Sequence, residues 1–147
     1  MIVGTEWLIE ATGCNPDALR DEHQVRVILT SVIDDLGLRS VGSVWHKFEG
    51  EGGITALVAL TESHLACHTY PEHGTATFNL YCCRTRPEWN WEANLRRKLG
   101  ATDVSVTRFE RGSRDHGSDE FQISNLRSEI GMRSRTDFAG ELGGGVS

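Results

Sequence analysis

Hydrophobic and polar residues alternate along several short parts of this chain, and the pattern predicts strands. Residues 4–12 carry Trp7, Leu8 and Ile9 among polar neighbours and are followed by a glycine, which predicts the first strand. Stretches rich in β-branched and aromatic residues predict further strands at 40–48, 54–61, 64–69, 75–83 and 103–110. Because short glycine- or proline-containing links separate the middle strands, we expect a largely antiparallel sheet.

Two other segments have the spacing of amphipathic helices. The Asn-Pro-Asp sequence at 15–17 is typical of a helix start, and apolar residues recur beyond it at three- and four-residue intervals until Gly37. We expect one helix there. A second helix is predicted around residues 91–99, where Trp and Leu recur every four residues before Gly100.

This order of elements predicts an α+β fold, a two-layer sandwich of a largely antiparallel sheet with helices on one face. We expect residues 1–112 to form this single domain. From residue 113 to 147 the composition changes to scattered apolar residues and a terminal glycine run, so we expect a flexible C-terminal tail.

Charge and cysteine content narrow the possible partners and the cellular compartment. The net charge of −6 over 147 residues provides no basic surface for nucleic acid or anionic lipid. The chain has no apolar run long enough to span a bilayer and begins without a basic, apolar leader, so we expect a cytoplasmic protein and no membrane partner. Its four cysteines include an adjacent pair, Cys82 and Cys83, and reduced thiols are expected.

Residues 46–83 hold most of the reactive side chains, and several explanations of this density are open. Serine and histidine are common in turns and on solvated strand faces. Metal binding is a second explanation, but Cys67 and His68 would face opposite sides of a strand, and no paired ligand motif is present. We therefore expect no metal. A third explanation is a cysteine nucleophile oriented by histidine, which depends on spatial contacts.

The stretch GGITALVALTESHLACHTYPEHGTATFNLYCC closely resembles the self-cleaving core of the bacterial S-adenosylmethionine decarboxylases. The segment 46–48 (His-Lys-Phe) is similar to that family's His-basic-Phe element, and the segments 4–6 (Gly-Thr-Glu) and 110–112 (Glu-Arg-Gly) extend the likeness. The resemblance covers about residues 4–112 and implies the fold expected above. It also implies a pyruvoyl-dependent enzyme of polyamine synthesis, which supplies the aminopropyl donor for spermidine.

The resemblance implies self-cleavage between Glu62 and Ser63. In the family the serine hydroxyl attacks the preceding carbonyl, and elimination then breaks the chain and leaves a pyruvoyl group. This would produce chains of 62 and 85 residues from the 147. Such chemistry needs a tight, strained turn and a donor for the developing oxyanion. Thr55 matches the assisting hydroxyl, usually serine, and His68 matches the residue that removes the α-proton.

The resemblance also assigns the substrate-binding and turnover residues. The pyruvoyl ketone would form a Schiff base with the amine of S-adenosylmethionine and serve in place of pyridoxal phosphate. Cys83 aligns with the proton donor, whereas Cys82 is interpreted as packing. Phe48 matches the adenine-stacking position, Glu72 the ribose-binding position, and Tyr70 occupies a place often held by tryptophan. The family's sites are shared between two protomers, which implies a homodimer.

Several positions depart from the usual bacterial pattern. The segment between Phe48 and Thr55 has one extra residue and lacks a proline. Asn79 stands where aspartate is common, Arg84 where glycine is usual, and Trp7 at a frequent histidine position. Two alternatives follow, a pyruvoyl-dependent ornithine or arginine decarboxylase on the same scaffold and an uncleaved, non-catalytic regulatory protein.

Overall fold

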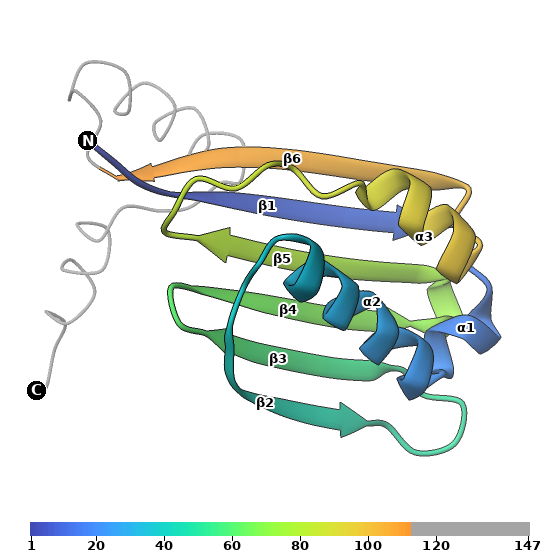
Figure 1. Ribbon diagram of the computed structural model, residues 1–147. Coiled ribbons are helices and arrows are strands. Elements are labelled where there is room, and N and C mark those ends of the chain that lie inside the picture. The colour runs from blue at the N-terminus through green and yellow to red at the C-terminus, as the bar shows by residue number, and fades with distance from the viewer. Residues whose placement is uncertain (113–147) are drawn as a thin grey trace, which may run out of the picture. The chain divides into compact units, whose positions relative to one another are not determined.

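The computed structural model describes residues 1–112 and shows one six-stranded sheet with helices on one face (Figure 1). The strands are β1 (Ile2–Thr12), β2 (Ser40–Lys47), β3 (Ile54–Leu60), β4 (Ser63–Tyr70), β5 (Thr75–Cys82) and β6 (Asp103–Gly112). The predicted α+β two-layer architecture is confirmed. The predicted tail, residues 113–147, lies outside the described residues and stays a prediction.

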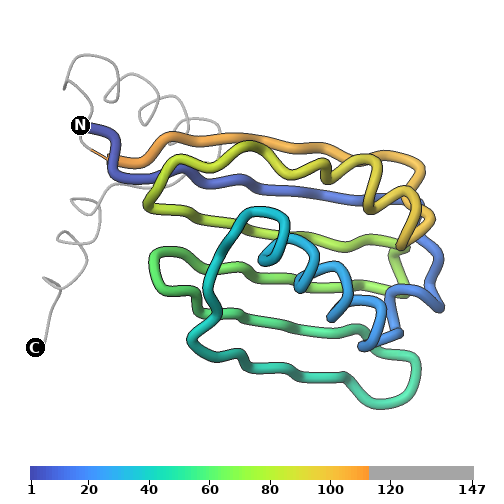
Figure 2. The backbone as a smooth tube through the Cα atoms, viewed as in Figure 1, coloured from blue at the N-terminus to red at the C-terminus, as the bar shows by residue number. Residues whose placement is uncertain are grey.

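Every neighbouring pair of strands in the sheet is antiparallel, in the order β2-β3-β4-β5-β1-β6. Consecutive hairpins join β2 to β5, as their short links predicted. Strand β1 enters between β5 and β6, so the beginning and the end of the described chain lie side by side (Figure 2). Strand β1 therefore connects β6, at the end of the described chain, to the hairpins formed by β2 to β5.

The helices are α1 (Pro16–Arg20), α2 (Glu22–Asp35) and α3 (Trp91–Leu99), with a 3-10 turn η1 (Pro71–His73) between β4 and β5. The single helix expected between residues 15 and 37 is therefore wrong. It is interrupted at Asp21, whose backbone is extended and whose carboxylate accepts a hydrogen bond from the Gln24 N–H at 3.3 Å. Aspartate is a favourable N-cap, so it ends α1 and begins α2 at the same residue.

The core fills the space between the helices and one face of the sheet. Along β3 and β5 the buried residues alternate with more exposed ones, as expected for strands covered on one side only. Helix α2 buries Val25, Ile28, Leu29 and Val32 against this face, and α3 buries Trp91, Leu95 and Leu99. The two predicted apolar helix faces thus form the second layer.

No helix of residues 1–112 covers the opposite face of the sheet, which we call the open face. It carries half-exposed or exposed apolar side chains from four strands: Leu8 (41%), Val44 (68%), Leu57 (49%) and Phe109 (43%). Apolar residues so exposed across one sheet face are typical of a surface that another molecule covers.

Candidate active site

The predicted site residues lie in two groups at opposite ends of β4. The first group, the turn cluster, comprises Glu62 and Ser63 with Cys82 and Cys83 beside them. The second group, the pocket cluster, comprises Phe48, Thr55, His68, Tyr70 and Glu72, which line a common pocket. At about 3.3 Å per residue, the Cα atoms of Ser63 and His68 lie about 17 Å apart. One copy of the chain therefore does not bring the two groups together.

The turn cluster begins at a tight connection between β3 and β4. Leu60 pairs with Ser63, so only Thr61 and Glu62 form the turn. The turn is as short as predicted. Among residues 1–112 no non-glycine residue has a positive φ, so the turn carries no left-handed backbone strain. The Glu62 carbonyl, which precedes Ser63, accepts a hydrogen bond from the Cys83 N–H at 2.9 Å. The sequence did not identify this backbone donor.

The two adjacent cysteines have different surroundings, because successive residues of a strand face opposite sides. Cys82 is 2% exposed, and this burial raises the pKa of its thiol above the ordinary value. A hydrogen bond with Ser63 and the charge of Arg86 offset only part of the increase. Cys83 is exposed and contacts Tyr81 instead. The interpretation of Cys82 as a packing residue agrees with its burial, yet in the continuous chain it is this thiol that contacts Ser63.

The pocket cluster surrounds a hollow of about 400 Å³ at the other end of β4. This volume is in the range of sites for small-molecule ligands. The Phe48 ring is 51% exposed and rests edge-on against His46, with ring centroids 4.5 Å apart, and the Tyr70 ring is 39% exposed. Two accessible aromatic residues and the Glu72 carboxylate thus line one hollow.

Thr55 and His68 face each other across β3 and β4. They are register partners, and Thr55 Oγ1 lies 3.1 Å from His68 Nδ1. Because a hydroxyl and a ring nitrogen at this distance form a hydrogen bond, the contact orients the imidazole and leaves Nε2 for another partner. The sequence did not predict that these two residues contact each other, and the roles that the resemblance gives them stay predictions.

A row of polar side chains crosses the open face beside Cys83, and the sequence singled out only parts of it. His64 Nε2 lies 2.9 Å from Asn79 Oδ1, and Asn79 Nδ2 donates to Glu6 Oε1 at 2.8 Å. Arg111 pairs with the other Glu6 oxygen. The Asn79 hydrogen bond, with help from Arg111, holds the Glu6 pKa below its ordinary value. The uncommon asparagine therefore links a histidine to a charged carboxylate.

Tyr81 connects this row to Cys83. Its ring lies under the Arg111 guanidinium, with 6.0 Å from the guanidinium carbon to the ring centroid. Partial loss of solvent, followed by the hydrogen bond with Cys83, raises the Tyr81 pKa. The Tyr81 hydroxyl thus lies next to the Cys83 thiol, two residues further along the chain.

Thr69 fixes the pocket wall to the helical layer. It is 5% exposed, its hydroxyl donates to the Leu19 carbonyl at 2.7 Å, and it accepts from the Ile54 N–H at 2.8 Å. We expect Thr69→Val to lower the free energy of unfolding by about 2 to 4 kcal/mol, because two buried backbone groups lose their partner.

Urea unfolding measures this loss, and Thr30→Val is the matched control because Thr30 is exposed on α2, in the helical layer and away from the open face. Both changes are made in the Ser63→Ala background, so that any self-cleavage does not alter the comparison. Equal midpoints for the two variants would contradict the role given to Thr69.

Residues 1–112 contain no group of three or more histidine, cysteine, aspartate or glutamate side chains placed to hold a metal ion. The expectation of a metal-free protein stays a prediction. Within the same residues, no helix has the length and apolar character needed to cross a membrane.

The fold and the two groups of residues define a class, a two-layer α+β protein with reactive side chains at both ends of one central strand. A family model described as S-adenosylmethionine decarboxylase matches residues 5–112. The crystal structure of the adenosylmethionine decarboxylase from Aquifex aeolicus VF5 has a TM-score of 0.66 and 25% identity, covering 80% of this chain and 98% of that one.

Curated relatives lead to the same family. The S-adenosylmethionine decarboxylase proenzyme of Prochlorococcus marinus (strain MIT 9313) is 35% identical over 112 residues, which is 75% of this chain and 88% of that protein. The proenzyme of the same name from Moorella thermoacetica (strain ATCC 39073 / JCM 9320) is 34% identical over 111 residues, with the same coverage. The chain belongs to the S-adenosylmethionine decarboxylase family, which confirms the resemblance seen in the sequence.

Proposed function

We propose that this protein cuts its own chain between Glu62 and Ser63 and then decarboxylates S-adenosylmethionine with the pyruvoyl group so formed. One observation carries the proposal. The carbonyl that precedes Ser63 lies in a two-residue turn and already accepts the Cys83 N–H at 2.9 Å. A hydroxyl next to a polarised carbonyl is the arrangement that self-cleavage requires.

In the cleavage, Ser63 Oγ bonds to the Glu62 carbonyl carbon, the bond from that carbon to the Ser63 nitrogen breaks, and the hydroxyl proton passes to the nitrogen. The Cys83 N–H stabilises the negative oxygen that develops. Loss of the Ser63 α-proton to His68 then releases Oγ with the Glu62 carboxylate. Water replaces the amine of the resulting unsaturated residue, which frees ammonia and leaves the ketone.

The pyruvoyl group supplies a ketone that can condense with an amine and a conjugated carbonyl that accepts electrons when carbon dioxide leaves. The chain's own residues bind the substrate and supply the proton. Phe48 and Tyr70 offer exposed rings to the adenine and the positive sulfonium, and Glu72 accepts hydrogen bonds from the ribose hydroxyls. Cys83, oriented by Tyr81, protonates the α-carbon.

The working site on this proposal is shared by two copies of the chain. Ser63 and Cys83 of one copy meet Phe48, Thr55, His68, Tyr70 and Glu72 of the other. Two features support a homodimer: the separation of about 17 Å between Ser63 and His68 along β4, and the apolar residues on the open face. Packing of two open faces would bury those residues.

Mixed dimers test whether two copies of the chain share each active site. A chain carrying Cys83→Ala and a chain carrying Glu72→Gln are each expected to have little activity alone. When the two are co-expressed, random pairing should restore about a quarter of the wild-type activity, because each mixed dimer keeps one intact site.

The control for the mixed dimers pairs Cys83→Ala with a chain carrying both changes, which leaves no intact site in any dimer. Activity that stays at the level of the separate variants in both mixtures would mean that each copy holds its own complete site.

Intact mass spectrometry of the purified protein tests the cleavage itself. We expect two chains, of 62 residues and of 85 residues from the 147, the second with a keto group in place of its amine. A continuous chain that still releases carbon dioxide from S-adenosylmethionine would overturn the proposal.

The relatives named above do not favour an ornithine or arginine decarboxylase, or an uncleaved regulatory protein. Offering S-adenosylmethionine, ornithine and arginine separately and measuring carbon dioxide distinguishes the substrates.

We place the protein in the cytoplasm and expect no pyridoxal phosphate. Its four free cysteines suit a reducing compartment.

A further inference from the structure

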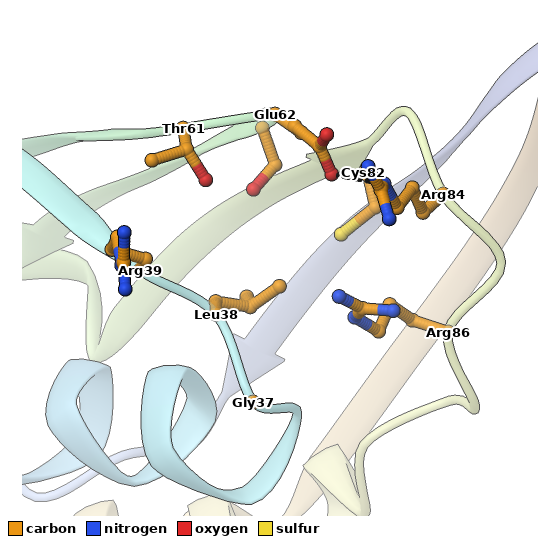
Figure 3. A pocket seen from close by; sticks show the side chains of 9 residues that line it. Gly37, Leu38, Arg39, Thr61, Glu62, Cys82, Arg84 and Arg86 are labelled. Carbon is orange, nitrogen blue, oxygen red and sulfur yellow. Dashed lines mark ion pairs between the residues drawn. The ribbon is translucent and has the colours of Figure 1, made fainter.

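A small pocket beside the Glu62–Ser63 bond is lined by three arginines, Arg39, Arg84 and Arg86 (Figure 3). Its volume is about 60 Å³. Because this is far less than the 400 Å³ of the hollow at the pocket cluster, the pocket suits a small group such as a carboxylate and not a nucleoside. It lies on the helix-covered side of the sheet, at the other end of β4 from the pocket cluster, and the proposed reaction makes no use of it.

Within residues 1–112, only Arg84 of these three arginines has an acidic partner. Arg84 Nε lies 2.5 Å from Glu62 Oε2, but the two side chains are 69% and 44% exposed, so water weakens this pair. Arg84 stands where the family usually has glycine, so the resemblance does not imply this contact. Arg39 instead contributes its carbonyl, which accepts the Thr61 N–H at 3.0 Å and holds the turn.

Arg86 has a buried side-chain N–H that finds no acceptor within residues 1–112. Its guanidinium projects into the pocket between Leu38 and Cys82 (Figure 3). Its Nη1 donates to the Thr85 carbonyl at 3.2 Å, whereas its Nε is buried and has no hydrogen-bond partner among the described residues. A buried N–H of a charged group without an acceptor is unfavourable, so the pocket has room and a donor for an anion.

Self-cleavage creates an anion at this place. In the continuous chain the Glu62 carbonyl has one oxygen and no charge. After the cut, its carbon also carries the former Ser63 hydroxyl oxygen and becomes a carboxylate. Glu62 then has two negative groups, one on its side chain and one at the new chain end, in a pocket that three arginines line.

We infer that Arg86, together with Arg84, binds the carboxylate that Glu62 acquires on cleavage, so that the pocket is an anchor for the new chain end. The inference rests on the proposed function. Arginine binds a carboxylate through two parallel hydrogen bonds, which fix its position as well as its charge. The anchor keeps the cut end of the turn in place next to residue 63, where a free chain end would otherwise fray.

The test compares how much an Arg86 substitution destabilises the cut protein and the uncut protein, because the new carboxylate exists only in the cut protein. Arg86→Gln is made in the wild-type chain and in the uncut Ser63→Ala chain, and thermal midpoints are measured for all four proteins. We expect Arg86→Gln to lower the midpoint of the cut protein by about 4 °C more than that of the uncut protein.

Arg97→Gln is the matched control, because Arg97 lies on α3, outside the residues that line the pocket, and donates to Asn94 Oδ1 at 3.0 Å. It should shift the cut and uncut proteins equally. Arg86→Lys keeps the charge but not the planar fork, so it should retain part of the difference, and it replaces Arg86→Gln if that variant does not fold.

Equal shifts from Arg86→Gln in the cut and uncut proteins would overturn the anchor while leaving the cleavage intact. The anchor would also be wrong if Glu62→Gln abolished the difference, since Arg86 would then bind the side chain and not the chain end. A wild-type chain that stays uncut is a separate result, seen directly by mass, and would overturn the proposed function as well.

Discussion

Replacing Ser63 by alanine is expected to leave one continuous chain of 147 residues without decarboxylase activity. Alanine keeps the backbone and the turn but removes the hydroxyl that attacks the Glu62 carbonyl. Without that attack no ketone forms, and the protein then has no group to accept electrons from the substrate. The loss should therefore be complete, both in cutting and in turnover.

A denaturing gel and the intact mass detect the cutting, and carbon dioxide released from S-adenosylmethionine measures the turnover. Ser105→Ala is the matched control, because Ser105 is exposed on β6. Cleavage of the Ser63→Ala chain at the same bond would show that another group performs the attack.

The second large effect is expected for Cys83→Ala, which should spare most of the cutting but slow turnover about 10²- to 10⁴-fold. The two effects separate because different atoms of the residue are involved. The backbone N–H that contacts the Glu62 carbonyl remains in alanine, whereas the thiol that gives its proton to the α-carbon is lost.

Single-turnover and steady-state rates of the fully cut variant measure this effect. The control is Cys14→Ala, which removes a buried thiol outside both groups of site residues and should affect stability more than rate. Normal turnover by Cys83→Ala would refute the role of Cys83 as proton donor. Failure to cut would instead indicate that the thiol, and not only the N–H, takes part in processing.

Most secondary structure of residues 1–112 could be predicted because it depends on local patterns. Stretches rich in β-branched and aromatic residues located most strands within one or two residues, and the four-residue spacing of Trp91, Leu95 and Leu99 located α3. The break at Asp21 was missed, since the apolar period of the first helical segment continues through it. There the side chain's capping hydrogen bond competes locally with the helix.

The candidate site was predicted as a set of residue types, and its spatial division was implied by the family resemblance alone. The motif around Ser63 and His68 identified both residues, but the distance between them depends on β4 being straight and fully paired on both sides. The contact of Cys82 with Ser63 depends on strand register, which local sequence does not specify, whereas Tyr81 and Cys83 are neighbours because they lie two residues apart on the same side of one strand.

By itself, the sequence determined which segments become strands and helices, where the reactive side chains lie along the chain, and which family they resemble, because these follow from spacing and residue type. Only the tertiary structure decided that β1 inserts between β5 and β6, that the Cys83 N–H donates to the Glu62 carbonyl, and that three arginines line one pocket with Glu62. These features arise from contacts between residues far apart in the chain, and such contacts are set by packing and hydrogen bonding of the whole sheet rather than by any local pattern.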